Sequence, residues 1–425
     1  MSPVCIVLLV FVSIPCEGRE GVGGSDQDWG YITVRPNAHM FWWLYYTTYN
    51  NVSNYTDRSL IIWLQGGPGM PASGFGNFLE IGPLDANFQG REGSFIENFN
   101  VLFIDNPVGV GFSYISDNET RMVTNGGGGE TAEDLYNFLK IFLDETHPEF
   151  KNVPLYVFGE SYGGKMATEF VYRLKQKEKF ENLTLCNLKA LALGGAFISP
   201  ISYISNYAAI AFHLGLVNKR VSARIDELTK QIQVLINKEA YEEASDIYDN
   251  ILNELDLILN VDFHNIVRKI NATWMTDFQK ITSTLEHVMN SKVKDKLNIT
   301  ADVYWEYNSD VYNSIKGDVL KSVTDKIETI LNTTDVKVLV YNGMLDFIVN
   351  TAGTVTWLDD LNWTGKEKWS TQNETVFKIN DVIEGYSKRV DNLVFYVVFR
   401  AGHSVPADNL LAMNEILRKE ILDDL

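Results

Sequence analysis

The chain has 425 residues, of which 45% are hydrophobic and 31 are glycines, so it encodes a globular protein with a large core and not a disordered one. Its formal net charge of −19 at pH 7 argues against nucleic acid or an anionic membrane as a partner. The length fits one domain with an insertion, or two domains.

The chain begins with a short apolar segment. Residues 4–14 have the length of the hydrophobic region of a secretory signal and are too few to span a bilayer. Small residues suit cleavage after Gly18, although no basic residue precedes the apolar run. Without residues 1–18 only Cys186 remains, so no intrachain disulfide is expected. The apolar segment therefore predicts a protein of the secretory pathway. Because no other segment is long enough to be transmembrane, we expect no stable membrane anchor.

Strands and helices alternate in the next part of the chain. Aromatic and β-branched runs predict the strands, and apolar residues at helical spacing predict the helices. Such alternation favours a mostly parallel sheet. The predicted strands are residues 29–34, 40–46, 60–64, 101–104, 153–158 and 188–193, and the predicted helices are residues 131–146 and 165–177.

A serine lies between two glycines where a predicted strand meets a predicted helix, at Gly159-Glu160-Ser161-Tyr162-Gly163. Glycine and serine are common in turns, and these five residues alone favour a structural turn. The flanking strand and helix reverse this interpretation, because a sharp strand–turn–helix that raises a serine hydroxyl above the sheet is the nucleophile elbow of an α/β-hydrolase.

A glycine-rich turn, Gly66-Gly67-Pro68-Gly69, follows the strand at residues 60–64. Its backbone N–H groups can point into a site, as an oxyanion hole requires. The hole would use the N–H of Gly67 and the N–H of Tyr162, the residue after the serine. A glycine-rich turn is usually only a turn, so this feature supports the prediction without carrying it.

The composition changes near residue 200. Residues 205–335 have many charges, few glycines and apolar residues at helical spacing, with clear helices predicted at residues 219–237 and 240–259. We expect a helical insertion at residues 200–335 that interrupts an α/β core formed by residues 19–199 and 336–425. The insertion would cover the catalytic face as a lid, or it is a helical domain with no part in catalysis.

Two later strands, residues 336–341 and 393–399, end beside polar side chains. The first presents Asp346 and the second presents His403. In isolation His403 is as readily a structural loop residue as a base, but the order Ser161, Asp346, His403 is that of an α/β-hydrolase triad. The other histidines are placed in a strand (His39) or in helical segments (His147, His213, His264 and His287).

Nine sequons support entry into the secretory pathway, since this is more than the composition would usually give. In contrast, the chain has no HExxH motif or paired Cys/His pattern, and we expect no metal or other cofactor. The predicted glycosylation sites are Asn51, Asn54, Asn118, Asn182, Asn271, Asn298, Asn332, Asn362 and Asn373.

Around Gly66, Ser161, Asp346 and His403 the chain resembles the serine carboxypeptidases. The similar segments occur in family order and span nearly all of the mature chain, and the aromatic residues 29–31 and 40–46 most resemble the retinoid-inducible branch. The resemblance implies an α/β-hydrolase fold, Ser161 as nucleophile, His403 as base and Asp346 as the residue that orients it. It also implies a secreted or lysosomal enzyme that removes C-terminal residues from peptides. The segments read WLQGGPG, EIGPL, DNPVGVGFSY, GESYGGK, YNGMLD and AGHSVPAD.

The family binds the substrate carboxylate with an amide side chain, a glycine N–H and two glutamates, which the resemblance assigns here to Gln65, Gly66 and Glu160. Two close carboxyl groups cannot both ionise easily, so one keeps its proton and can donate a hydrogen bond. The second glutamate is expected at position 79, which is a leucine, and the side chain of Glu80 is expected to point elsewhere.

Other departures from the family pattern lie at Met70-Pro71, Gly195-Ala196-Phe197 and Ser404. They keep open an esterase or acyltransferase with the same triad, or a secreted glycoprotein that binds peptides with little turnover. Activity at acidic pH, usual in the family, implies either a depressed pKa of His403 or better carboxylate recognition by protonated Glu160.

Overall fold

A computed structural model describes residues 18–422, except residues 51, 53, 118–119, 124–127, 260 and 270–281. The signal segment and the sequons at Asn51, Asn118 and Asn271 therefore lie wholly or almost wholly outside the described residues. Within the part that is described, none of the helices has the length and hydropathy of a membrane span.

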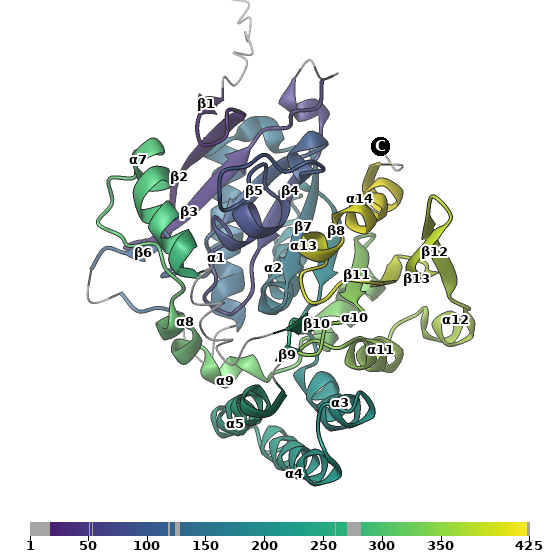
Figure 1. Ribbon diagram of the computed structural model, residues 1–425. Coiled ribbons are helices and arrows are strands. Elements are labelled where there is room, and N and C mark those ends of the chain that lie inside the picture. Colours follow the sequence, from purple (N-terminus) through teal and green to yellow (C-terminus); the bar gives the residue numbers. More distant parts are fainter. Residues whose placement is uncertain are drawn as a thin grey trace, which may run out of the picture.

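One large sheet runs through the molecule (Figure 1). It has 12 strands in the order β1-β2-β3-β5-β4-β7-β8-β11-β14-β13-β12, with β6 paired to β3. The strands are β1 (Arg19–Glu20), β2 (Asp26–Arg35), β3 (Ala38–Tyr45), β4 (Leu60–Leu64), β5 (Asn100–Ile104), β6 (Tyr114–Ile115), β7 (Pro154–Glu160), β8 (Asn187–Gly194), β11 (Lys337–Gly343), β12 (Thr375–Ile379), β13 (Val382–Val390) and β14 (Leu393–Val398).

The centre of the sheet is parallel, from β5 through β4, β7, β8 and β11 to β14, and antiparallel strands extend it at both edges. All residues of β4 and β14 are buried, as expected for central strands covered on both faces. Parallel strands place their carboxyl ends at one edge of the sheet, so the segments after β4, β7, β11 and β14 meet there. The predicted mostly parallel sheet is confirmed.

Two apolar cores lie on the two faces of this sheet. One packs against α1 and α2, and the other packs against α14 and the helical turn η2. The helices outside residues 200–335 are α1 (Gly128–Ile141), α2 (Tyr162–Glu181), α11 (Thr351–Asp360), α12 (Lys366–Thr371), α13 (Val405–Asp408) and α14 (Leu410–Leu417), with shorter or wider turns at η1 (Tyr55–Asp57), η2 (Phe75–Ile81), η3 (Phe95–Glu97), η4 (Phe142–Thr146), η5 (Pro148–Phe150) and η7 (Arg418–Leu422).

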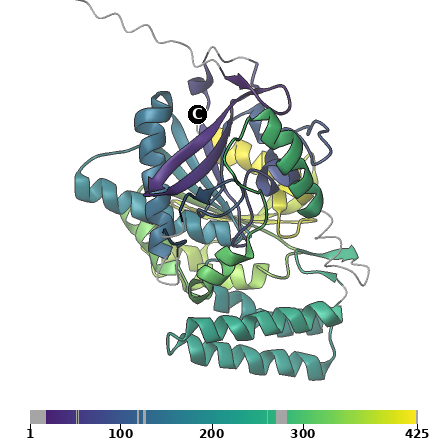
Figure 2. The same ribbon diagram turned by 90° about the vertical axis from the view of Figure 1, so that its left-hand side faces the viewer.

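Residues 200–335, called the inserted segment below, connect the neighbouring strands β8 and β11. Its helices α4 and α5 pack against each other and project away from the sheet (Figure 2). The segment is not wholly helical, because it contains a hairpin, β9 (Val261–Asp262) and β10 (Asn265–Lys269), that the sequence did not predict. Its helices are α3 (Pro200–His213), α4 (Lys219–Ile236), α5 (Tyr241–Leu259), η6 (Met289–Val293), α7 (Lys294–Lys296), α8 (Ser309–Ser314), α9 (Lys316–Val319) and α10 (Thr324–Thr333).

Candidate active site

Ser161 lies in the turn between β7 and α2, with φ 59° and ψ −128°. A non-glycine residue at positive φ is strained and persists only where its surroundings hold it. Gly159 and Gly163 allow this turn, since a Cβ on Gly159 would collide with the backbone of Gly163 and a Cβ on Gly163 would collide with the carbonyl of Leu64. The local geometry is therefore that of a nucleophile elbow.

The loop after β4 lies against this serine. A Cβ on Gly66 would lie 2.6 Å from Ser161 Cβ and 3.1 Å from its Oγ, so only glycine fits. Gly67 has φ +109°, a conformation that favours glycine. Tyr162 begins α2, where the first N–H groups have no partner within the helix. The N–H groups predicted for the oxyanion hole thus belong to the two segments that adjoin Ser161.

Asp346 and His403 form a buried hydrogen-bonded pair. The loops after β11 and β14 bring His403 Nδ1 within 2.8 Å of Asp346 Oδ2, and Asp346 Oδ1 accepts the N–H of Val349 at 2.9 Å. Burial lowers the pKa of His403, but the charge of Asp346 and its hydrogen bond outweigh this and raise the pKa to about 9. This shift is opposite in direction to the depressed pKa of His403 that was one of the two explanations for acidic activity.

Gly195 contributes to the site in a way that the sequence did not reveal. Its φ is +44°, and a Cβ there would lie 3.0 Å from His403 Nδ1 and 3.3 Å from Asp346 Oδ2. The neighbouring Phe197 donates its N–H to the carbonyl of Ser161 at 2.9 Å. The segment after β8 thus touches all three residues of the predicted triad.

Glu80 points into the site, which corrects the expectation that it points elsewhere. Gln65 Nε2 donates to Glu80 Oε1 at 2.9 Å and to Glu160 Oε1 at 3.1 Å, and Trp63 Nε1 holds Gln65 Oε1 at 2.8 Å. Ser404 Oγ donates to Glu160 Oε1 at 2.8 Å. The second glutamate of the pair is therefore Glu80, and the assignment of its position to Leu79 is wrong.

The cause is the wide helical turn η2. The N–H of Asn77 donates to the carbonyl of Ala72, and that of Gly82 donates to the carbonyl of Asn77, so the turn closes every five residues. Such a turn changes which side chains face inward. Leu79 is half-buried against the neighbouring apolar core, whereas Glu80 is buried beside Gln65.

The two buried glutamates differ in how readily they hold a proton. Burial and the charge of Glu160 raise the pKa of Glu80 well above its ordinary value. Burial also raises the pKa of Glu160, but a hydrogen bond from Glu80 and the positive charge of His403 oppose this rise. Glu80 is thus the member of the pair that more readily holds a proton, as expected when two carboxyl groups lie close together.

A second buried cluster joins α2 to the inserted segment. Asp318 Oδ2 accepts the hydroxyl of Tyr162 at 3.0 Å and lies 2.9 Å from Lys165 Nζ. Lys165 and Asp318 are both buried. The cluster anchors the start of α2, directly after Ser161. No sequence pattern predicts this cluster, because Asp318 is one acid among many in a charged helical segment.

Two of the other histidines are not helical, contrary to the sequence prediction. His147 lies in the turn before Pro148, and His264 lies in the turn of the β9–β10 hairpin. His264 packs against His403 with 5.3 Å between ring centroids. Among the described residues, no three His, Cys, Asp or Glu side chains are arranged to hold a metal ion.

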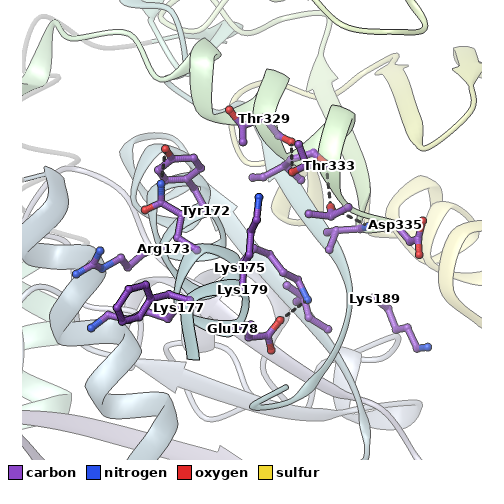
Figure 3. Close-up of a pocket in the computed structure, with 16 residues that line it drawn as sticks. Tyr172, Arg173, Lys175, Lys177, Glu178, Lys179, Lys189, Thr329, Thr333 and Asp335 are labelled. Carbon is purple, nitrogen blue, oxygen red and sulfur yellow. Dashed lines mark hydrogen bonds and ion pairs between the residues drawn. The ribbon is translucent and has the colours of Figure 1, made fainter. Parts of the chain in front are cut away.

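A large groove lies elsewhere in the molecule (Figure 3). It measures about 1400 Å³ and is lined by the second half of α2, the start of β8 and the end of α10. None of the candidate-site residues named in this subsection lines it. The groove lies where β8 and β11 begin, and the carboxyl ends of those strands hold the candidate site.

Comparison with known proteins identifies this arrangement. The profile of the family described as serine carboxypeptidase matches residues 19–422. The chain belongs to the serine carboxypeptidase family. It is 35% identical over 406 residues to a retinoid-inducible serine carboxypeptidase of Rattus norvegicus, which covers 89% of this chain and 88% of the relative. It is 31% identical to the serine carboxypeptidase-like 51 protein of Arabidopsis thaliana, covering 90% of this chain and 89% of that one.

The fold is that of the same family. The crystal structure of a prohormone-processing carboxypeptidase from Saccharomyces cerevisiae superposes with a TM-score of 0.80 and 24% identity, covering 94% of this chain and 92% of the other. The predicted α/β-hydrolase fold is confirmed, and the chain is an enzyme of the serine carboxypeptidase class.

Proposed function

We propose that this serine carboxypeptidase releases the C-terminal residue of peptides through an acyl-enzyme on Ser161. The observation that carries the proposal is the buried Glu80–Gln65–Glu160 cluster, whose last member directly precedes Ser161. This cluster and the N–H of Gly66 would bind a free carboxylate close to the nucleophile. Such a site selects the last peptide bond of a chain.

In the proposed reaction His403 must first be neutral. Its Nδ1 faces Asp346, which leaves Nε2 to accept the proton of Ser161 Oγ. The oxygen attacks the carbonyl carbon of the last peptide bond, and the N–H groups of Gly67 and Tyr162 stabilise the oxyanion. The proton passes to the leaving amine, and a water activated by His403 then hydrolyses the acyl-enzyme.

The glutamate pair supports activity at acidic pH. The charge of Glu160 is one cause of the raised pKa of His403. When Glu160 takes up a proton, this charge is lost and the pKa of His403 falls, which extends the neutral form of the base to lower pH. The same proton provides a donor for the substrate carboxylate. Protonation of the pair thus favours both substrate binding and the base.

We further propose that the enzyme is a glycoprotein of the secretory pathway, secreted or lysosomal, with residues 1–18 as its signal. All six sequon asparagines that the structure describes are exposed, which supports glycosylation: Asn54, Asn182, Asn298, Asn332, Asn362 and Asn373. We also propose that the inserted segment, which interrupts the core formed by residues 19–199 and 336–425, covers the catalytic face as a lid.

A serine-reactive fluorophosphonate probe and paired peptides test the proposal. The parent should be labelled, and Ser161→Ala should lose the label and on the order of 10³-fold or more in kcat/KM while remaining folded. Mass spectrometry of peptides with free and amidated C-termini should show release of single residues from the free form. Equal turnover of both forms would instead indicate an esterase or acyltransferase, and a folded parent without labelling or turnover would indicate a peptide-binding glycoprotein.

A further inference from the structure

The β9–β10 hairpin of the inserted segment contacts both loops that carry Asp346 and His403. In Figure 1 it lies between the helices of the inserted segment and the strand ends of the core. Four backbone hydrogen bonds join it to these loops: Phe347 N to Phe263 O (3.0 Å), Ile348 N to Phe263 O (3.2 Å), Ile266 N to Leu345 O (3.1 Å) and His403 N to His264 O (2.6 Å). The hairpin therefore links the acid loop to the base loop.

The hairpin is also fastened to the segment after His403. Asp408 Oδ2 accepts both Asn265 Nδ2, at 2.8 Å, and the N–H of Gly402, at 2.7 Å. Arg268 forms an ion pair with the same carboxylate. Only glycine fits at position 402, because a Cβ there would collide with the carbonyl of His264.

His264 places a second imidazole beside His403. The ring centroids lie 5.3 Å apart with 59° between the ring planes. Asp262 Oδ1 accepts the backbone N–H of His264 at 2.8 Å and lies 3.1 Å from its Nδ1. One carboxylate thus fixes both the backbone and the ring of His264, as Asp346 fixes the ring of His403.

The charged groups around His403 come from several elements. Asp346 is in direct contact, and Glu160 and Asp262 each raise the pKa of His403 through their charge. His264 is the titratable group of the hairpin turn, and Arg268 lies behind it, 3.8 Å from Asp262. The charge of Asp262 therefore acts on the base in the same direction as that of Asp346.

We infer that Asp262 and His264 are positioning residues for His403, forming an outer carboxylate–histidine pair by which the inserted segment aligns the base and sets its working pH. This inference rests on the proposed role of His403. It makes the hairpin part of the active site, and it does not depend on whether the rest of the inserted segment acts as a lid.

Three variants test it in the full chain, by kcat and KM on a neutral ester and a peptide and by the pH dependence of fluorophosphonate labelling. Asp262→Asn keeps the oxygen that accepts from His264 and removes the charge. Without that negative charge the protonated form of His403 is less stable, so the pKa of His403 falls. The acidic limb of the pH profiles of activity and labelling should then move to lower pH by about half a unit. Asp226→Asn is the control, because it removes the same charge from the exposed surface of α4.

His264→Gln keeps the backbone hydrogen bonds and removes the ring. It should lower the plateau kcat roughly tenfold with KM nearly unchanged, because a loosely held base spends less time aligned. His264→Phe keeps a ring of similar shape and should recover most of the loss.

Distinct results separate this inference from the proposed function. A folded parent that resists labelling overturns the role of Ser161 and His403, and this inference with it. If the parent is labelled but the acidic limb of Asp262→Asn coincides with the limbs of the parent and of Asp226→Asn, only this inference is overturned. An unchanged plateau kcat in His264→Gln does the same, and if that variant fails to fold, the Asp262→Asn limb decides.

Discussion

Ser161 and His403 are held in place by different parts of the chain. The N–H of Ser161 donates to the carbonyl of Gly194 at 3.0 Å, and its carbonyl accepts from Gly164 and Phe197, so its backbone is fixed by the core. The N–H of His403 instead donates to His264, on the hairpin of the inserted segment. The nucleophile is built by neighbours in the sheet, whereas the base depends on a segment that is distant in sequence.

This difference has consequences for how each residue responds to change. The elbow has almost no free space, since side chains at Gly66, Gly159 and Gly163 would all collide with backbone or with Ser161. The base is aligned by hydrogen bonds across a boundary between two regions, which a substitution can loosen by degrees. We therefore expect steep losses on the nucleophile side and graded losses on the base side.

Among substitutions of the residues that support the triad, the largest effect is expected at Gly66, on the nucleophile side. Gly66→Ala places a methyl group 2.6 Å from Ser161 Cβ and 2.8 Å from the carbonyl oxygen of Glu160, so the serine or the loop must move. Displacement by about 1 Å can cost on the order of 10²-fold in rate, and kcat/KM should fall by about that factor.

Gly90→Ala is the matched control, because a Cβ there has no neighbour within 4 Å and its activity should equal that of the parent. Both variants should keep the parent far-UV circular dichroism. A Gly66→Ala enzyme with parental kcat/KM would show that the loop yields easily and that the contrast between the two sides is false.

A smaller effect is expected at Glu80, which separates carboxylate recognition from the triad. Glu80→Leu removes one carboxyl of the buried pair, and a charged hydrogen bond contributes about 1–3 kcal/mol. The ratio of kcat/KM for free over amidated peptides should fall roughly tenfold, mainly through KM. Leu79→Ala should leave this ratio unchanged, because Leu79 packs against the apolar core. The assignment fails if Leu79→Ala lowers the ratio as much as Glu80→Leu does.

The same contrast separates what the sequence could and could not predict. The elbow and the parallel strands are encoded by short runs with local physical causes, and the structure has both. It also joins Asp346 to His403 by a hydrogen bond, whereas the role of Ser161 beside them stays a prediction. The position of Glu80 was missed because the wide turn η2 changes which residue faces inward, and nothing in its sequence reveals such a turn.

The contacts across the boundary were missed for a different reason. β9 has two residues, too few for an alternating pattern, and its surroundings have helical spacing, so His264 was read as helical. Asp318 and Lys165 meet only after folding, and each is an ordinary charged residue in the sequence. The sequence patterns therefore do not predict these contacts between segments that are distant in the chain.

The last prediction concerns stability at that boundary and not the rate of the reaction. Glu169 of α2 is buried near Lys165, and burial raises its pKa from the usual 4.5 to about 7, with Lys165 opposing the rise and Asp318 adding to it. Lys326 and Asp325 of α10 act on the same carboxyl in opposite directions.

A carboxyl whose folded pKa is raised binds its proton more tightly in the folded state, so folding loses stability as pH rises from about 4.5 through 7. Glu169→Gln cannot ionise, and it should therefore stabilise the protein by up to about 3 kcal/mol at pH 8 and have little effect at pH 4.5. Urea unfolding at the two pH values measures this, with Asp226→Asn as an exposed control on α4. A gain of equal size at both pH values would mean that Glu169 does not titrate between them, and that the boundary tolerates a buried charge better than its burial implies.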